Sequence, residues 1–267
     1  MSPISTAQHV QDIVVARHLD FVCAVAACLL VLTALAIIWT ARLSLGRDVY
    51  VSVMGAEGMP TAAWFQAALV LISAGGGLVA FAARGIRVAS RVLGWWRPSV
   101  SLGLASAFFL LASQVTCTPG CPIPYGPSFT WPDFTHTTAA VLAFAFACWA
   151  MVQLTCAPGR RMMAALSLCS GIAVAVIAGA GGIMSLAGWE TDLGSRFEFA
   201  ATTIAILWLV SLGVVIAGQT APLRGLRPGT EPFRRHAPAP RSGLTREGAG
   251  ATRSRPGADA RGLSVPR

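Results

Sequence analysis

The chain contains few charged residues and no lysine. Only 12% of its 267 residues are charged and 55% are hydrophobic, whereas a soluble globular domain carries about 25% charged residues. Folding this chain in water would leave large apolar patches exposed, so the composition excludes an ordinary soluble domain. Every basic side chain apart from histidine is an arginine, a usage typical of a high-GC bacterial genome. The sequence therefore predicts a bacterial membrane protein.

Six apolar stretches reach, or nearly reach, the length of about 20 residues that a helix needs to cross the hydrocarbon core. They cover residues 21–40, 62–83, 99–115, 134–154, 162–187 and 197–218, and the third is the shortest. The first is too long for the apolar part of a signal peptide and is predicted to stay uncleaved. The predicted fold is an all-α, polytopic bundle of six transmembrane helices over residues 20–218, between an N-terminal segment (1–19) and a polar tail (219–267).

The arginines predict how the bundle is oriented. Outside the tail, seven lie on the side of the two termini and three on the other side, and cytoplasmic loops are the ones that carry an excess of basic residues. Both termini are therefore predicted to be cytoplasmic, with the protein in the inner (plasma) membrane of the cell. The three arginines on the outer side are Arg42, Arg47 and Arg196.

Two basic segments face the predicted cytoplasmic side. Arg84, Arg87 and Arg91 share one helical face, which indicates either a short amphipathic helix on the inner surface or an ordinary basic loop with tryptophan anchors. The tail holds ten arginines and seven prolines and is predicted to be disordered. Both segments are expected to attract anionic inner-leaflet lipids. Neither segment contains a feature that recognises a base sequence, so no specific nucleic-acid partner is expected. The sequence does not predict the oligomeric state.

Glycines cluster in two of the predicted spans. Because small side chains let helix backbones approach closely in a membrane, the clusters predict tight helix packing; a flexible helix of a transporter is the alternative. The glycines are Gly75, Gly76 and Gly77 in the second span, and Gly171, Gly179, Gly181 and Gly182 in the fifth.

The outer loop between the third and fourth spans carries two cysteines around a Pro-Gly turn. The turn can bring the α-carbons of Cys117 and Cys121 within disulfide range, and the predicted outer compartment is oxidising. We therefore expect a Cys117–Cys121 disulfide. A zinc site using both thiols with His136 and Asp133 is the alternative, but the spacing matches no common ligand pattern, so no metal and no cofactor are predicted.

Asp133 and His136 open the fourth span and lie three residues apart on one helical face. One interpretation is structural: Asp133 caps the helix, and His136 bonds to a loop carbonyl. The other is functional: Asp133 orients or charges the imidazole, as in acid–base sites. The two residues are therefore candidates for catalysis as well as for ligand binding.

The remaining outer loops supply further polar candidates. Glu57 lies in a Gly- and Pro-containing turn before the second span, and Glu190 lies before the sixth. Arg196 is four residues from Asp192 and could pair with it on a helix, or could meet an anion. Glu198 enters the sixth span. We expect Glu57, Asp133, His136, Glu190 and Arg196 to line the rim of an outer-facing pocket.

The order of these motifs resembles the bacterial membrane family known as domain of unknown function 998. The resemblance rests on Ser52-x-x-Gly55 with Pro60 and Phe65, on the Cys117/Cys121 loop, and on Asp133-x-x-His136. The first turn is also similar to one in the Frag1/DRAM/Sfk1 membrane group, which bears on lipid handling. The first resemblance implies a fold more than an activity, because that family is itself uncharacterised.

Three functions are compatible with this pattern. The first is a membrane protein, more regulatory than enzymatic, that binds a lipid or a small polar ligand at the outer pocket. The second is a membrane-embedded hydrolase using Asp133 and His136, which lacks a convincing nucleophile. The third is a transporter, which the absence of charged residues near the centre of any span disfavours if transport is ion-coupled.

Overall fold

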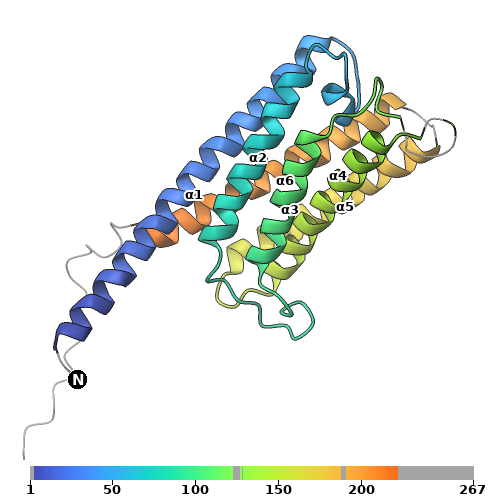
Figure 1. Cartoon of the computed structure of the whole chain (residues 1–267). Coiled ribbons are helices and arrows are strands. Elements are labelled where there is room, and N and C mark those ends of the chain that lie inside the picture. The colour runs from blue at the N-terminus through green and yellow to red at the C-terminus, as the bar shows by residue number, and fades with distance from the viewer. Residues whose placement is uncertain (1–2, 123–126, 128, 188–190, 222–267) are drawn as a thin grey trace, which may run out of the picture. The chain divides into compact units, whose positions relative to one another are not determined.

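The computed structural model describes residues 3–122, 127, 129–187 and 191–221. Its six α-helices belong to one compact unit, and no strand occurs in the described residues (Figure 1). The predicted all-α bundle is confirmed. The helices are α1 (Pro3–Leu45), α2 (Ala62–Ala82), α3 (Pro98–Gln114), α4 (Trp131–Thr155), α5 (Arg161–Ala187) and α6 (Thr191–Thr220), with a 3-10 helix η1 (Ser52–Gly55) between α1 and α2.

Five of these helices are long and apolar enough to cross a membrane, and α3, with 17 residues, is shorter. The ends of α2 to α5 agree with the predicted spans to within three residues. Both α1 and α6 are longer than predicted, because their helices continue from the apolar stretch into the polar residues before it. The chain is a multi-pass membrane protein.

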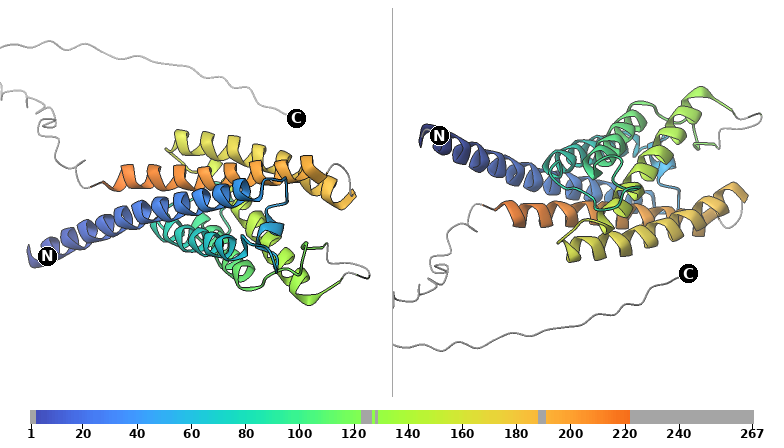
Figure 2. Two further views of the ribbon diagram at one scale, coloured as in Figure 1. Left: turned by 90° about the horizontal axis from the view of Figure 1, so that it is seen from above. Right: turned by 90° about the horizontal axis from the view of Figure 1, so that it is seen from below.

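Each helix packs against the next one in the chain, and α6 returns to pack against α1 and α2 (Figure 1). In the views of Figure 2, α1 and α6 run side by side. The arrangement leaves a central space bordered by α1, α2, α3, α4 and α6. α5 lies outside this space and exposes Leu168, Ile172 and Val176, as a lipid-facing helix should.

Glycines allow α2 and α6 to approach α1. Gly75 on α2 faces Val31 and the backbone of Ala27, and Gly213 on α6 faces the side chain of Cys28. Other members of the predicted clusters do not make such contacts: Gly77, Gly179 and Gly182 have nothing within 4 Å of where a Cβ would lie. The glycine clusters thus contain both packing positions and open ones.

The basic segment between α2 and α3 is a loop of turns and not an amphipathic helix. Its carbonyl groups are held by the bundle: the amide of the buried Gln153 on α4 donates to the carbonyls of Leu93 and Trp96, each at 2.9 Å. Ser101 completes the network by donating to Gln153 Oε1 at 2.7 Å. The second interpretation, a basic loop with tryptophan anchors, is therefore the one that the structure supports.

Arginines gather at the same end of the bundle as this loop. Arg84 pairs with Asp20 of α1. Near the end of α6, Arg17 donates to the carbonyl of Gln219 at 3.1 Å, and Arg160 donates to its side-chain oxygen at 2.5 Å. The arginines that the sequence assigned to one side of the membrane thus lie at one end of the described bundle.

Candidate functional site

The central space is a cavity with an empty volume of about 930 Å³, including the part that is open at its mouth. Its residues on α6 extend from Glu198 to Leu209, and those on α4 from His136 to Ala147, so that the first and last are eleven positions apart in each case. At 1.5 Å per residue the cavity is about 16 Å long, or about half of a hydrocarbon core of ~30 Å.

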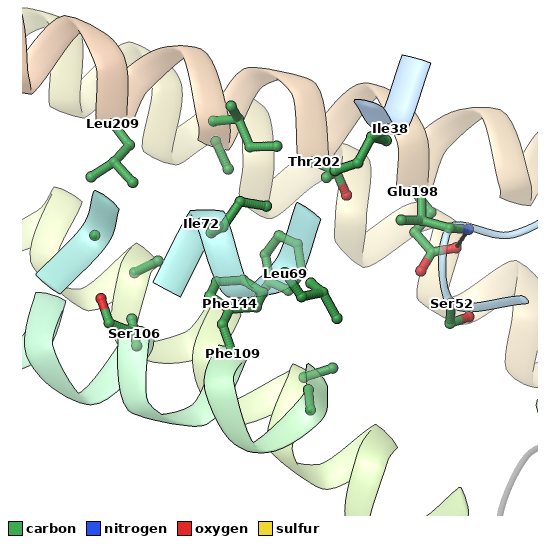
Figure 3. Close-up of a pocket in the computed structure, with 18 of the residues that line it drawn as sticks. Ile38, Ser52, Leu69, Ile72, Ser106, Phe109, Phe144, Glu198, Thr202 and Leu209 are labelled. Atoms are coloured by element: carbon green, nitrogen blue, oxygen red, sulfur yellow. Dashed lines mark hydrogen bonds between the residues drawn. The ribbon is translucent and has the colours of Figure 1, made fainter. Parts of the chain in front are cut away.

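Most of the cavity wall is apolar. Leu69 and Ile72 of α2 line its middle part together with Phe109 and Phe144, whose ring centroids lie 5.5 Å apart (Figure 3). The hydroxyl of Ser106, at the deeper end, is already bonded to the carbonyl of Leu102 in its own helix. An alkyl chain therefore meets no unsatisfied hydroxyl there.

Polar side chains gather at the other end of the cavity. Glu198 and Thr202 come from successive turns of α6, and Ser52 comes from η1 (Figure 3). Glu198 Oε2 accepts a hydrogen bond from the backbone N–H of Val51 at 2.8 Å, so the carboxylate also fixes the loop that carries Ser52. The fourth polar group is His136 of α4.

His136 is oriented by the end of α3. Its Nδ1 lies 2.9 Å from the carbonyl oxygen of Ala112 and 2.7 Å from that of Val115. Because a carbonyl can only accept, Nδ1 must carry the proton, and a neutral ring then has an acceptor at Nε2. The predicted bond of His136 to a loop carbonyl is present in this form.

Asp133 is fully buried and bonds to the loop instead of the imidazole. Its Oδ1 accepts from the N–H of Thr118 at 2.7 Å, and its Oδ2 accepts from the hydroxyls of Thr118 and Thr130 at 2.8 and 2.6 Å. The N-cap of α4 is Thr130, whose hydroxyl accepts from the N–H of Asp133. The expectation that Asp133 itself is the cap was wrong, because Thr130 precedes Pro132 at the position where capping side chains act.

The Cys117 and Cys121 sulfurs are bonded to each other, with their α-carbons 4.9 Å apart. The carbonyl of Cys117 accepts from the N–H of Glu57 at 2.9 Å, so this loop is tied to the loop before α2. Both sulfurs and a ring nitrogen of His136 lie within 4.8 Å of one another. Zinc would require both sulfurs as thiolates, whereas here they form a disulfide. Asp133, the fourth residue of the zinc alternative, does not belong to this group.

Arg196 pairs with Asp48 and not with Asp192. Its Nε lies 2.7 Å from Asp48 Oδ2, and Arg42 Nη2 lies 2.6 Å from Asp48 Oδ1. The hydrogen bond from Arg196, and then the charges of Arg196 and Arg42, hold the pKa of Asp48 below its ordinary value against the opposing effect of burial. Asp192 was the closer candidate in sequence, but Asp48 comes from the loop after α1.

This pair of arginines gives a pH-dependent contribution to stability. The pKa of Asp48 is lower in the folded protein than in the unfolded protein. The stabilisation is therefore complete at a pH above the pKa of the unfolded protein, and it is lost as the pH falls through the pKa of the folded protein. We expect Asp48→Asn to lower the melting temperature slightly at about pH 7 and to make a progressively smaller difference as the pH falls below about 4. Thermal melts of both proteins across this range test it, with Glu57→Gln, an exposed acid, as the control; a pH-independent difference would contradict it.

Of the five predicted rim residues, His136 lines the cavity. Asp133 supports the neighbouring loop, while Glu57 is exposed and Arg196 points to Asp48. Glu190 lies outside the described residues. The sequence reasoning noted Glu198 but left it out of the site, together with Ser52 and Thr202. Glu198 could have been found from its position at the start of an apolar span, where a carboxylate is costly and seldom incidental.

Comparisons with known proteins place the chain in a family without assigning an activity. No curated protein and no solved structure matches it. The likeness to the Frag1/DRAM/Sfk1 group is not shown by these comparisons. A family model described as "Protein of unknown function (DUF998)" matches residues 22–215, which covers all six helices except the first part of α1 and the last residues of α6. The chain therefore belongs to the DUF998 family, as the order of its motifs indicated.

Proposed function

We propose that this protein binds a single-chain amphipathic lipid, with the alkyl chain inside the bundle and the head group at the polar end of the cavity. The observation that carries the proposal is the division of the cavity wall. Leu69, Ile72 and Phe109 line an apolar part, and Ser52 and Glu198 lie together at one end. A ligand that is apolar over most of its length and polar at one end matches this division.

The length of the cavity favours one chain from one leaflet. At about 16 Å it corresponds to about half of the hydrocarbon core. A lipid that entered with its head at the membrane surface would therefore reach the middle of the bilayer. This geometry suits a molecule taken from, or presented to, a single leaflet, and gives no path for a polar solute through the apolar part.

We further propose that the polar end faces outwards from the inner (plasma) membrane of a bacterial cell. The support is the excess of arginines at the opposite end, where Arg17, Arg84 and Arg160 gather, since basic residues mark the cytoplasmic side. Arg87 and Arg91 are exposed there and would meet anionic headgroups. The ligand would then belong to the outer leaflet.

Filling the cavity tests the binding function. Ala140 of α4 lines the cavity, whereas Ala145 on the same helix is exposed. We expect Ala140→Phe to weaken binding of dodecanol by about tenfold or more, because the new ring occupies the space of the chain. Ala145→Phe, the matched control, should bind as the unmodified protein does.

The measurement is native mass spectrometry of the protein reconstituted in lipid nanodiscs, titrated with dodecanol. Equal binding by the two variants and the unmodified protein would place the ligand outside the cavity. Absence of saturable binding to the unmodified protein would remove the proposal altogether.

A further inference from the structure

Glu198 carries the one carboxyl group that lines the cavity in the described part of the chain. Arg42, whose charge also acts on Glu198, makes its own contacts elsewhere. Arg42 donates to the carbonyl of Val49 at 2.9 Å and to Asp48 at 2.6 Å, and its guanidinium lies 4.6 Å from the ring centroid of Phe199. No cation therefore points into the described cavity to receive an anionic head group.

The carboxylate has unused capacity. A carboxylate has about four lone-pair sites, and the backbone N–H groups of Val51 and Ser52 use two of those on Glu198. The remaining sites can accept from a ligand. A buried carboxylate with only part of its capacity satisfied is unfavourable, and a cationic donor is the group that relieves this best.

The other polar groups at this end can also accept hydrogen bonds. His136 donates from Nδ1 to backbone carbonyls, and in its neutral form it has an acceptor at Nε2. The hydroxyls of Ser52 and Thr202 each carry acceptor lone pairs. An ammonium group has three N–H donors and no acceptor. It is the complement of a wall that presents a carboxylate and several further acceptors.

We propose that the lipid bound in this cavity carries a primary ammonium head group, which pairs with Glu198. This inference rests on the proposed lipid-binding function and adds the chemical class of the ligand. Anionic amphipaths such as fatty acids would place a second negative charge beside Glu198 and are disfavoured. Neutral alcohols can donate one hydrogen bond but cannot neutralise the carboxylate, so they bind more weakly than amines.

The experiment compares three probes that share one alkyl chain: dodecylamine, dodecanol and laurate. Each is titrated into the nanodisc-reconstituted protein, and the bound fraction is measured by native mass spectrometry. We expect dodecylamine to bind about tenfold or more tightly than dodecanol, and laurate to bind most weakly. Glu198→Gln should abolish the preference of the protein for dodecylamine over dodecanol.

The control is Glu57→Gln, which removes an exposed carboxylate at the same end of the bundle and should leave the preference unchanged. If Glu57→Gln abolishes it as well, the amine is responding to surface charge and the inference is wrong. Equal binding of the three probes, or a preference that survives Glu198→Gln, overturns the inference and leaves lipid binding intact. Failure of all three probes to bind removes the proposed function as well.

Discussion

Replacing Gly75 by leucine is expected to prevent the formation of a stable bundle, whereas the same replacement at Gly77 is expected to be tolerated. A Cβ at Gly75 would lie 2.5 Å from Val31 Cγ2 and 3.1 Å from the carbonyl oxygen of Ala27 on α1. The backbone oxygen cannot move without shifting the helix. Overpacking of this kind costs about 1–3 kcal/mol and occasionally more, and close packing of backbones is a main source of helix association in lipid.

Gly77 is the matched control because it is in the same helix and the same glycine run. Nothing lies within 4 Å of where its Cβ would be. The yield of monodisperse protein after purification and its melting temperature are the measurements. Gly75→Leu should be poorly recovered and melt well below the unmodified protein, and Gly77→Leu should resemble it. Similar behaviour of the two variants would show that α2 does not pack against α1 through Gly75.

These two glycines also show how far the sequence could predict the fold. Hydropathy located the helices, because the bilayer fixes the length and the apolar character of a span. It could not tell which side of a helix faces its neighbours, because lipid tails are as apolar as the side chains between helices. Gly75 and Gly77 belong to the same run of glycines, so the sequence does not distinguish them. They differ in the side of α2 on which they lie: Gly75 faces α1, and Gly77 does not.

The site was harder to predict than the spans, because its contacts join distant parts of the chain. The spacing allowed Arg196 to pair with Asp192, four residues away, but Arg196 pairs with Asp48. Asp133 and His136 do share one helical face, as their spacing predicted. Their partners, however, are Thr118 and the last turn of α3, which the sequence could not place. Local spacing defined the face and gave no information on what lies opposite to it.

The second large effect is expected for Asp133→Ala. Removing the carboxylate leaves the N–H and hydroxyl of Thr118 and the hydroxyl of Thr130 without their acceptor in a buried environment. Hydrogen bonds to charged groups contribute about 1.5–3 kcal/mol each, with strong non-additivity. We expect a total loss of about 3 kcal/mol in the free energy of unfolding, with faster hydrogen exchange at the Thr118 amide.

The same experiment separates a structural role of Asp133 from a catalytic one. Asp192→Ala is the control: this acid also lies in the first turn of a helix, but its side chain is exposed, so the change should stay within about 0.5 kcal/mol. Asp133→Asn keeps one acceptor oxygen and should fall between the two. If Asp133→Ala melts like the unmodified protein, its three hydrogen bonds do not hold the loop. The carboxylate would then have to be explained by its neighbour His136, as an acid–base pair would require.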